Sequence, residues 1–114
     1  MRPVIVKAYG SLDPAGEEAL EAVRGVLESW FIDAGAVELE GDLLRISFEG
    51  DVFPDDEVVD ALRPFLSDAS RGKLDILDLE EWTLHRYFFT YGTVRDNKVT
   101  LDKALETCSM KSGL

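Results

Sequence analysis

The sequence predicts an α+β domain, and three observations carry this prediction. The stretch Lys73–Leu101 is dense in aromatic and β-branched residues, which favour strands. Two earlier stretches open with proline and acidic residues and then repeat apolar residues every three to four positions, as helices do. A Gly-Asp dipeptide separates two short alternating runs, which indicates a β-hairpin. At 114 residues we expect one domain over residues 1–108 and a flexible tail over 109–114.

The first elements are expected to be a buried strand and a long helix. The strand, Val4–Tyr9, should end at Gly10. The helix is predicted over Pro14–Ala34, because Asp13 before a proline is a favourable N-cap and Gly35 is a suitable C-terminal stop. The acidic side chains expected on its outer face are Glu17, Glu18, Glu21 and Glu28.

The hairpin around Gly41-Asp42 has a register that can be tested by pairing its residues. Val37–Glu40 and Leu43–Glu49 are the predicted strands. Glu40 opposite Leu43 places the apolar residues on one face and sets Glu38 opposite Arg45, an opposite-charge pair. A slip of one residue would move every apolar side chain to the other face, so the register is well specified. The apolar face consists of Val37, Leu39, Leu44, Ile46 and Phe48.

The second predicted helix opens at Pro54, followed by three acidic residues. Its C-terminal end is ambiguous, because Pro64 lies within the apolar pattern. A proline inside a helix removes a hydrogen bond and costs about 3 kcal/mol. Either the helix bends at Pro64, or it stops near Leu62 and a separate turn follows. The sequence analysis favours one bent helix reaching about Ala69.

Three strands are predicted after the second helix. Lys73–Leu79 has an irregular apolar pattern, which predicts a bulge or a strand apolar on both faces. Trp82–Thr90 alternates cleanly, and either Gly92 or Asp96-Asn97 turns the chain into a last strand. A short helix is expected over Asp102–Thr107. The alternation places Trp82, Leu84, Arg86 and Phe88 on one side and Thr83, His85, Tyr87 and Phe89 on the other.

This β-α-β-β-α-β order, with an added C-terminal aromatic β-hairpin and a short terminal helix, is the ferredoxin-like split βαβ order. Both helices should then cover one face of the sheet. The other face would be open unless the hairpin or a second copy covers it, which would favour a homodimer. Many unrelated functions share this fold, so it implies no activity.

The net charge of −11 is concentrated in one part of the chain. Between Asp13 and Asp60 there are fifteen acidic residues and two basic ones, Arg24 and Arg45. This region is either a solvated face that helps solubility or a surface that meets a basic partner. The charge argues against direct nucleic-acid binding, because phosphate contacts need lysine and arginine.

No apolar run approaches the ~18 residues of a membrane span. The single cysteine, Cys108, is consistent with a cytoplasmic setting.

The sequence contains no catalytic motif and implies no cofactor. Asp75, Asp78, Glu81 and His85 are spaced to bind a metal only on a helix, whereas the segment is predicted as strand, so no metal is expected. As a general base, His85 lacks a nucleophile at a recognisable spacing. Whether the chain is an enzyme therefore stays open, with a non-enzymatic role favoured.

Our first functional hypothesis is a small acidic module that binds another protein. Its candidate acidic residues are Glu17, Glu21, Glu28, Asp55, Asp56 and Asp60, and its candidate hairpin residues are Trp82, His85, Arg86 and Tyr87. Tryptophan, tyrosine and arginine are common in interface hot spots, and Arg86 is placed to stack on Trp82. Leu84 and Phe88 are expected in the core. The alternative hypothesis is a small-ligand sensor or enzyme with a site at a dimer interface near the hairpin.

Overall fold

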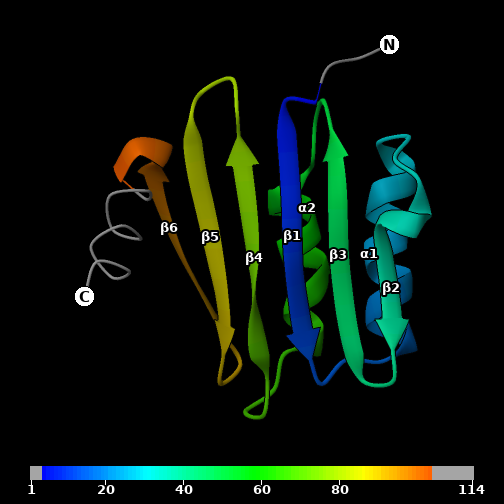
Figure 1. The fold of residues 1–114 in the computed structure, drawn as a ribbon. Coiled ribbons are helices and arrows are strands. Elements are labelled where there is room, and N and C mark those ends of the chain that lie inside the picture. The colour runs from blue at the N-terminus through cyan, green and yellow to red at the C-terminus, as the bar shows by residue number, and fades with distance from the viewer. Residues whose placement is uncertain (1–3, 104–114) are drawn as a thin grey trace.

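The computed structural model describes residues 4–103 and has a mixed α+β fold (Figure 1). Its six strands form one antiparallel sheet in the order β2-β3-β1-β4-β5-β6. Both α-helices lie on the same side of that sheet. Within residues 4–103, no helix is long and apolar enough to cross a membrane. The elements are β1 (Val6–Asp13), α1 (Glu17–Ser29), β2 (Val37–Glu40), β3 (Leu43–Gly50), α2 (Asp55–Leu62), β4 (Arg71–Asp78), β5 (Thr83–Thr90) and β6 (Thr93–Thr100), with short 3₁₀ helices over Ala34–Ala36 and Arg63–Phe65.

The core lies between the two helices and the sheet. Alternate residues of each strand point toward the helices, and these are the buried ones. Among residues 4–103, helices cover only this face, and the hairpin β5–β6 extends the sheet sideways instead of folding over the opposite face (Figure 1). The largest fully buried side chains are Phe89, Leu12, Leu27, Leu44, Leu62 and Leu74.

The first strand is longer than predicted, and the first helix starts later. β1 continues through Gly10 to Asp13, which pairs with Arg71 of β4. Gly10 is not a stop: a Cβ there would lie 2.5 Å from the Lys73 carbonyl oxygen, so glycine lets β1 and β4 approach closely. Since the sheet holds Asp13 extended, it does not cap α1, whose N-cap is Gly16.

The first helix also ends earlier than predicted, at Ser29. The N–H of Ile32 donates to the carbonyl of Leu27 and that of Phe31 to Glu28, the Schellman pattern of a helix end. Phe31 occupies the left-handed position of this motif with φ of 58°, where glycine is usual. The predicted stop, Gly35, lies instead in the 3₁₀ helix, where its N–H donates to Asp33 Oδ1 at 2.7 Å.

The hairpin register is confirmed pair for pair. Glu40 lies opposite Leu43, Leu39 opposite Leu44, Glu38 opposite Arg45 and Val37 opposite Ile46. Gly41 has φ of 63°, which the tight two-residue turn requires. The ion pair of Arg45 is with Glu40, however, at 3.4 Å on the diagonal.

The preferred prediction of one bent second helix was wrong, and the alternative is correct. α2 ends at Leu62, and a separate 3₁₀ turn over Arg63–Phe65 contains Pro64 near its start. Pro64 has no N–H to donate to the Asp60 carbonyl, so the α-helical ladder cannot continue through it.

The strands of the C-terminal half resolve the alternatives that the sequence left open. β4 pairs regularly on both sides, so it has no bulge; Leu74 and Ile76 face the helices and Leu77 faces away. Tyr91 and Gly92 form the β5–β6 turn with φ of 50° and 77°. The other candidate turn, Asp96-Asn97, lies inside β6.

The predicted terminal helix can be followed only at its start. Residues 101–103 are helical, and the N–H of Lys103 donates to Thr100 Oγ1 at 3.3 Å. Thr100 is therefore the cap, while Asp102 lies inside the turn. The rest of Asp102–Thr107, and the predicted tail over 109–114, lie outside the described residues.

Candidate functional site

The two helices form a surface of acidic side chains that we call the helical acidic layer. It has eight carboxylates and two arginines, Arg24 and Arg63. Each arginine is paired within its own turn, Arg24 with Glu21 at 3.0 Å and Arg63 with Asp60 at 3.1 Å. The carboxylates are Glu17, Glu18, Glu21 and Glu28 on α1 and Asp55, Asp56, Glu57 and Asp60 on α2.

The two halves of the layer lie on neighbouring helices, because α1 and α2 pack against each other. At the end of α1, the Trp30 indole N–H donates to Glu57 Oε2 of α2 at 2.8 Å. All of these carboxylates are exposed except that of Asp55, which is half-buried. The acidic residues named from the sequence therefore lie on two packed helices, and two of them, Asp55 and Asp56, are turned toward Tyr87 of β5.

The opposite face of the sheet has a different charge. Half of the chain's twelve basic residues lie there, alternating with small and apolar side chains. Five acidic residues of β1 to β4 lie on the same face, so its net charge is close to neutral: Asp13, Glu38, Glu40, Glu49 and Asp75. The basic residues are Lys7, Arg45, Arg71, Lys73, Arg86 and Arg95.

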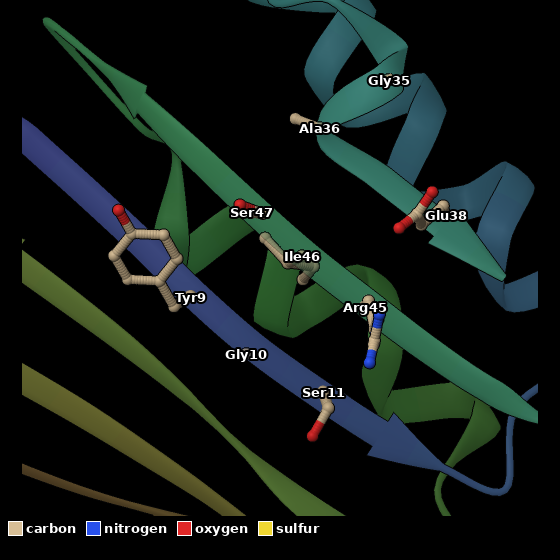
Figure 2. A pocket seen from close by; sticks show the side chains of 9 residues that line it. All are labelled: Tyr9, Gly10, Ser11, Gly35, Ala36, Glu38, Arg45, Ile46 and Ser47. Atoms are coloured by element: carbon tan, nitrogen blue, oxygen red, sulfur yellow. The ribbon is translucent and has the colours of Figure 1, made fainter. Parts of the chain in front are cut away.

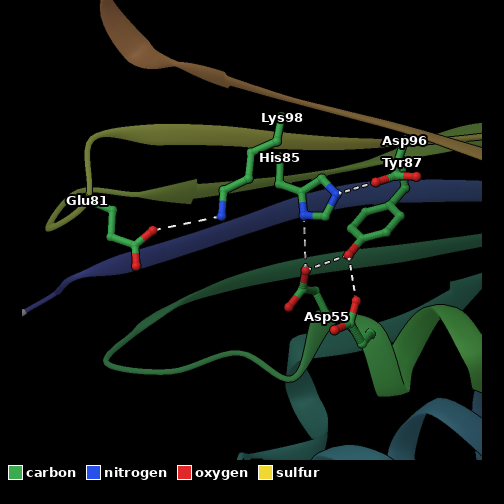
Figure 3. Close-up of polar contacts among 7 residues, drawn as sticks. Asp55, Glu81, His85, Tyr87, Asp96 and Lys98 are labelled. Atoms are coloured by element: carbon green, nitrogen blue, oxygen red, sulfur yellow. Dashed lines mark hydrogen bonds and ion pairs between the residues drawn. The ribbon is translucent and has the colours of Figure 1, made fainter.

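A polar cluster joins the start of α2 to the strands β5 and β6 (Figure 3). The Tyr87 hydroxyl donates to Asp55 Oδ2 at 2.6 Å and lies 3.0 Å from Asp56 Oδ1. His85 Nε2 lies 2.8 Å from Asp96 Oδ2, and its Nδ1 lies 3.5 Å from Asp55 Oδ2. The structure thus brings together two hairpin residues and two acidic residues that the sequence analysis named separately. We call these five residues the β5 cluster.

Burial and the neighbouring carboxylates set the pKa of Tyr87 within the β5 cluster. The Tyr87 side chain is 5% exposed. Burial first, and then Asp55 and Asp56, raise the pKa of Tyr87 far above its usual value of 10, because each disfavours a phenolate. The His85 ring lies with its centroid 4.3 Å from that of Tyr87. The hydroxyl therefore stays a donor and holds α2 against β5.

The other two hairpin residues lie elsewhere. Arg86 points to the opposite face of the sheet, where its guanidinium makes two hydrogen bonds to Asp75, at 2.6 and 2.9 Å. Its guanidinium carbon lies 6.0 Å from the centroid of the Phe88 ring, and the stacking on Trp82 stays a prediction. Trp82 precedes β5 with φ of 61° and donates its indole N–H to Asp102 at 2.9 Å.

Two β5 residues that were expected in the core, Phe88 and Leu84, lie on the open face of the sheet. Phe88 was expected in the core but is 40% exposed, because it lies on the face that no helix covers. Leu84 is half-buried on that face, opposite Leu77.

The four residues considered for a metal do not converge. Asp75 lies on the open face and His85 on the helix face. Asp78 Oδ1 accepts the backbone N–H groups of Glu80 and Glu81, which shapes the β4–β5 turn. Within residues 4–103, no three histidine, cysteine or acidic side chains are grouped to hold a metal ion.

The sequence analysis missed two hollows that follow β3. One, of about 400 Å³, lies on the open face between β1, β3 and the segment entering β2 (Figure 2). The second, of about 730 Å³, adjoins it, sharing Gly35, Ala36 and Ser47. Nearby, the Tyr9 hydroxyl donates to Glu49 Oε1 at 2.6 Å, which raises the pKa of Tyr9 and lowers that of Glu49. No sequence pattern indicates these hollows, because they depend on where β2 begins relative to β3.

The comparisons with known proteins identify no relative: no family model, no curated protein and no solved structure matches the chain.

Proposed function

We propose that this chain is a small protein-interaction module that binds a basic partner through the helical acidic layer. The observation that carries the proposal is the segregation of charge between the two faces of the sheet. One face bears eight carboxylates against two internally paired arginines, whereas the open face bears six basic and five acidic residues and is close to neutral. Simple solvation does not require such a separation.

Electrostatics gives this surface a defined role in binding. A single-sign surface steers an oppositely charged protein to it and raises the association rate, and this effect weakens as salt increases. The β5 cluster supports the layer, because the buried Tyr87 hydroxyl fixes Asp55 and Asp56 at the start of α2. The acidic surface is therefore held on a rigid frame.

Capture of partners from a host lysate at low and at high salt tests this function. The native chain is compared with a layer variant in which Glu17, Glu21, Glu28, Asp55, Asp56 and Asp60 are changed to Gln or Asn. A basic protein held only by the native chain, and released by salt, supports the proposal. The same protein on both baits would contradict it.

A second candidate function is a small-ligand sensor or enzyme that uses the β5 cluster. The observation that favours it is His85 between two carboxylates, Asp55 and Asp96, an arrangement suited to proton transfer. A homodimer that buries the hairpin would be needed to enclose such a site. Light scattering of the purified chain, with melting curves against a panel of metabolites, tests this function. A monomer without any ligand-induced shift would contradict it.

Two further proposals concern the fold of this module and the cell compartment in which it acts. We propose a ferredoxin-like split βαβ unit in the first four strands and two helices. The antiparallel order β2-β3-β1-β4 and the helices on one face support it.

We also propose that the chain acts in the cytoplasm, where its single cysteine, Cys108, would stay reduced. Fractionation of the host cell tests the second statement.

A further inference from the structure

The outer edge of β3 is only partly used by the sheet. β2 pairs with β3 from Leu43 to Ile46, whereas β3 continues to Gly50 along β1. Along an antiparallel strand, the N–H and C=O groups of successive residues point to alternate sides. Those of Ser47 and Glu49 therefore point to the β2 side, as the N–H and C=O of Leu43 do at the hairpin. Within residues 4–103, no strand pairs with this edge beyond Ile46. A free strand edge is a template for another strand.

A groove runs beside this free edge. Its volume is about 730 Å³; one wall is formed by residues 47–52 and the other by residues 30–36. The hollow of Figure 2 continues it toward Tyr9 and Arg45. The groove and this hollow together follow β3 from Arg45 to Gly50, the direction that an added strand would take.

Phe31 stands at the far wall of the groove in an unfavourable conformation. Its side chain is 98% exposed, and its φ of 58° is one that bulky residues rarely adopt. A glycine would complete the same helix end without the steric cost. Strain of this kind at an exposed residue is typical of binding sites. Trp30 and Val52 add further exposed apolar surface to the groove.

The ionisable side chains that line this groove are all acidic. Asp33, Glu49 and Asp51 contribute carboxylates, and no lysine or arginine lines it. Lys7, which lies outside the groove, pairs with Glu49 at 3.5 Å, so Asp33 and Asp51 carry most of the groove's negative charge. Such a groove attracts a segment that carries positive charge and disfavours an acidic one.

We propose that the groove binds an extended segment of another protein, in which apolar and basic residues alternate, as an added strand on β3. The backbone of the segment pairs with the Ser47 carbonyl and with the N–H and carbonyl of Glu49. Its alternate side chains then divide between the apolar surface of Phe31 and Trp30 and the three carboxylates. This site lies at the sheet edge and is distinct from the helical acidic layer, although Trp30 joins the two through its hydrogen bond to Glu57.

The probe is an acetylated and amidated hexapeptide of alternating valine and lysine, titrated into the ¹⁵N-labelled full chain in physiological salt. We expect saturable shifts of backbone amides in residues 30–36 and 47–52. A peptide of alternating valine and glutamate is the charge control and should not bind. Shifts confined to α1 and α2, or equal binding of both peptides, would overturn the proposal. So would an absence of shifts, as expected if a second copy or the chain's own terminal residues occupied the groove.

Two substitutions separate the groove from general surface effects. Phe31→Gly removes the phenyl group and relieves the backbone, so the variant should melt no lower than the native chain while its Kd rises about tenfold. Tyr91→Gly is the matched control, since Tyr91 is also an exposed aromatic with positive φ but lies at the β5–β6 turn. Unchanged affinity in Phe31→Gly, or an equal loss in Tyr91→Gly, would contradict the proposal.

The backbone contribution is tested at Glu49. Glu49→Ala removes the carboxylate and keeps the N–H, whereas Glu49→Pro also removes the outward N–H but leaves the bonds to β1. Melting curves confirm that each variant is folded. Peptide affinity should fall further in Glu49→Pro than in Glu49→Ala, and equal affinities would exclude strand addition.

Discussion

The Tyr87 hydroxyl donates a 2.6 Å hydrogen bond to Asp55, which joins strand β5 to the first residue of helix α2. Thirty-two residues separate the two in sequence. The bond matters because it ties the helical acidic layer to the C-terminal hairpin. It is also the contact that unites the acidic and the hairpin residues named from sequence.

Removing this hydroxyl should destabilise the fold. We expect Tyr87→Phe to lower the free energy of unfolding by about 1–2 kcal/mol, since the hydroxyl bonds two carboxylates from a mostly buried ring. Urea denaturation followed by fluorescence measures the change. Tyr9→Phe is the control, because Tyr9 is exposed and should change stability little. A larger loss in Tyr9→Phe would contradict the structural role of Tyr87.

The same hydroxyl should make stability fall in alkali. The pKa of Tyr87 is raised in the folded chain above the value of about 10 of an unfolded tyrosine. Its contribution is therefore fully present below pH 10 and is lost as the pH rises above it, because only the unfolded chain readily loses the proton. Tyrosinate absorbance should show one tyrosine that ionises only on unfolding, and Tyr87→Phe should abolish that step. Three tyrosines ionising in the folded chain would contradict it.

The ion pair between Arg86 and Asp75 should be measurable despite lying on the open face. The guanidinium binds both carboxylate oxygens, and Asp75 is mostly buried, so a double-mutant cycle should give a coupling of about 1 kcal/mol. The variants are Arg86→Gln, Asp75→Asn and both together. The pair Lys98 and Glu81, at 3.8 Å on the surface, should give a much smaller coupling. Equal coupling free energies for the two pairs would mean that the bidentate geometry of Arg86 and Asp75 adds no stability.

Phe31→Gly should stabilise the chain. The left-handed φ of Phe31 favours glycine, and the phenyl group is almost fully exposed. We expect the free energy of unfolding to rise by about 0.5–1 kcal/mol, after the greater entropy of an unfolded glycine is included. Thermal melting checks the sign. A clear loss of stability would show that the phenyl group packs in the native state.

Sequence reasoning succeeded where local pattern and turn chemistry agree. The β2–β3 register followed from Gly41-Asp42 and from four apolar residues that share only one possible face. The face assignment of β5 followed from simple alternation, which correctly separated Arg86 from His85. Such patterns need no knowledge of distant residues.

Prediction from the sequence failed where a contact with a residue distant in the chain overrides a local preference. Asp13 is a good helix cap in isolation, but the sheet holds it extended opposite Arg71. The left-handed Phe31 ends α1 before the glycine that usually would. The β5 cluster joins Asp55 to His85, and no spacing rule connects residues so far apart. The groove was missed because it arises from the unequal lengths of β2 and β3.

A charge-matched comparison of affinities tests the central claim, that the helical acidic layer is the binding surface. The layer variant is compared with a control in which the exposed residues Glu38, Glu40, Asp42, Asp68, Glu80 and Glu81 are changed to Gln or Asn, so both lose six charges. Affinity for the captured basic partner is measured by calorimetry at two salt concentrations. We predict weaker binding and a smaller salt dependence in the layer variant, with the control close to native. Equal losses in both variants would show that net charge, and not this surface, governs binding.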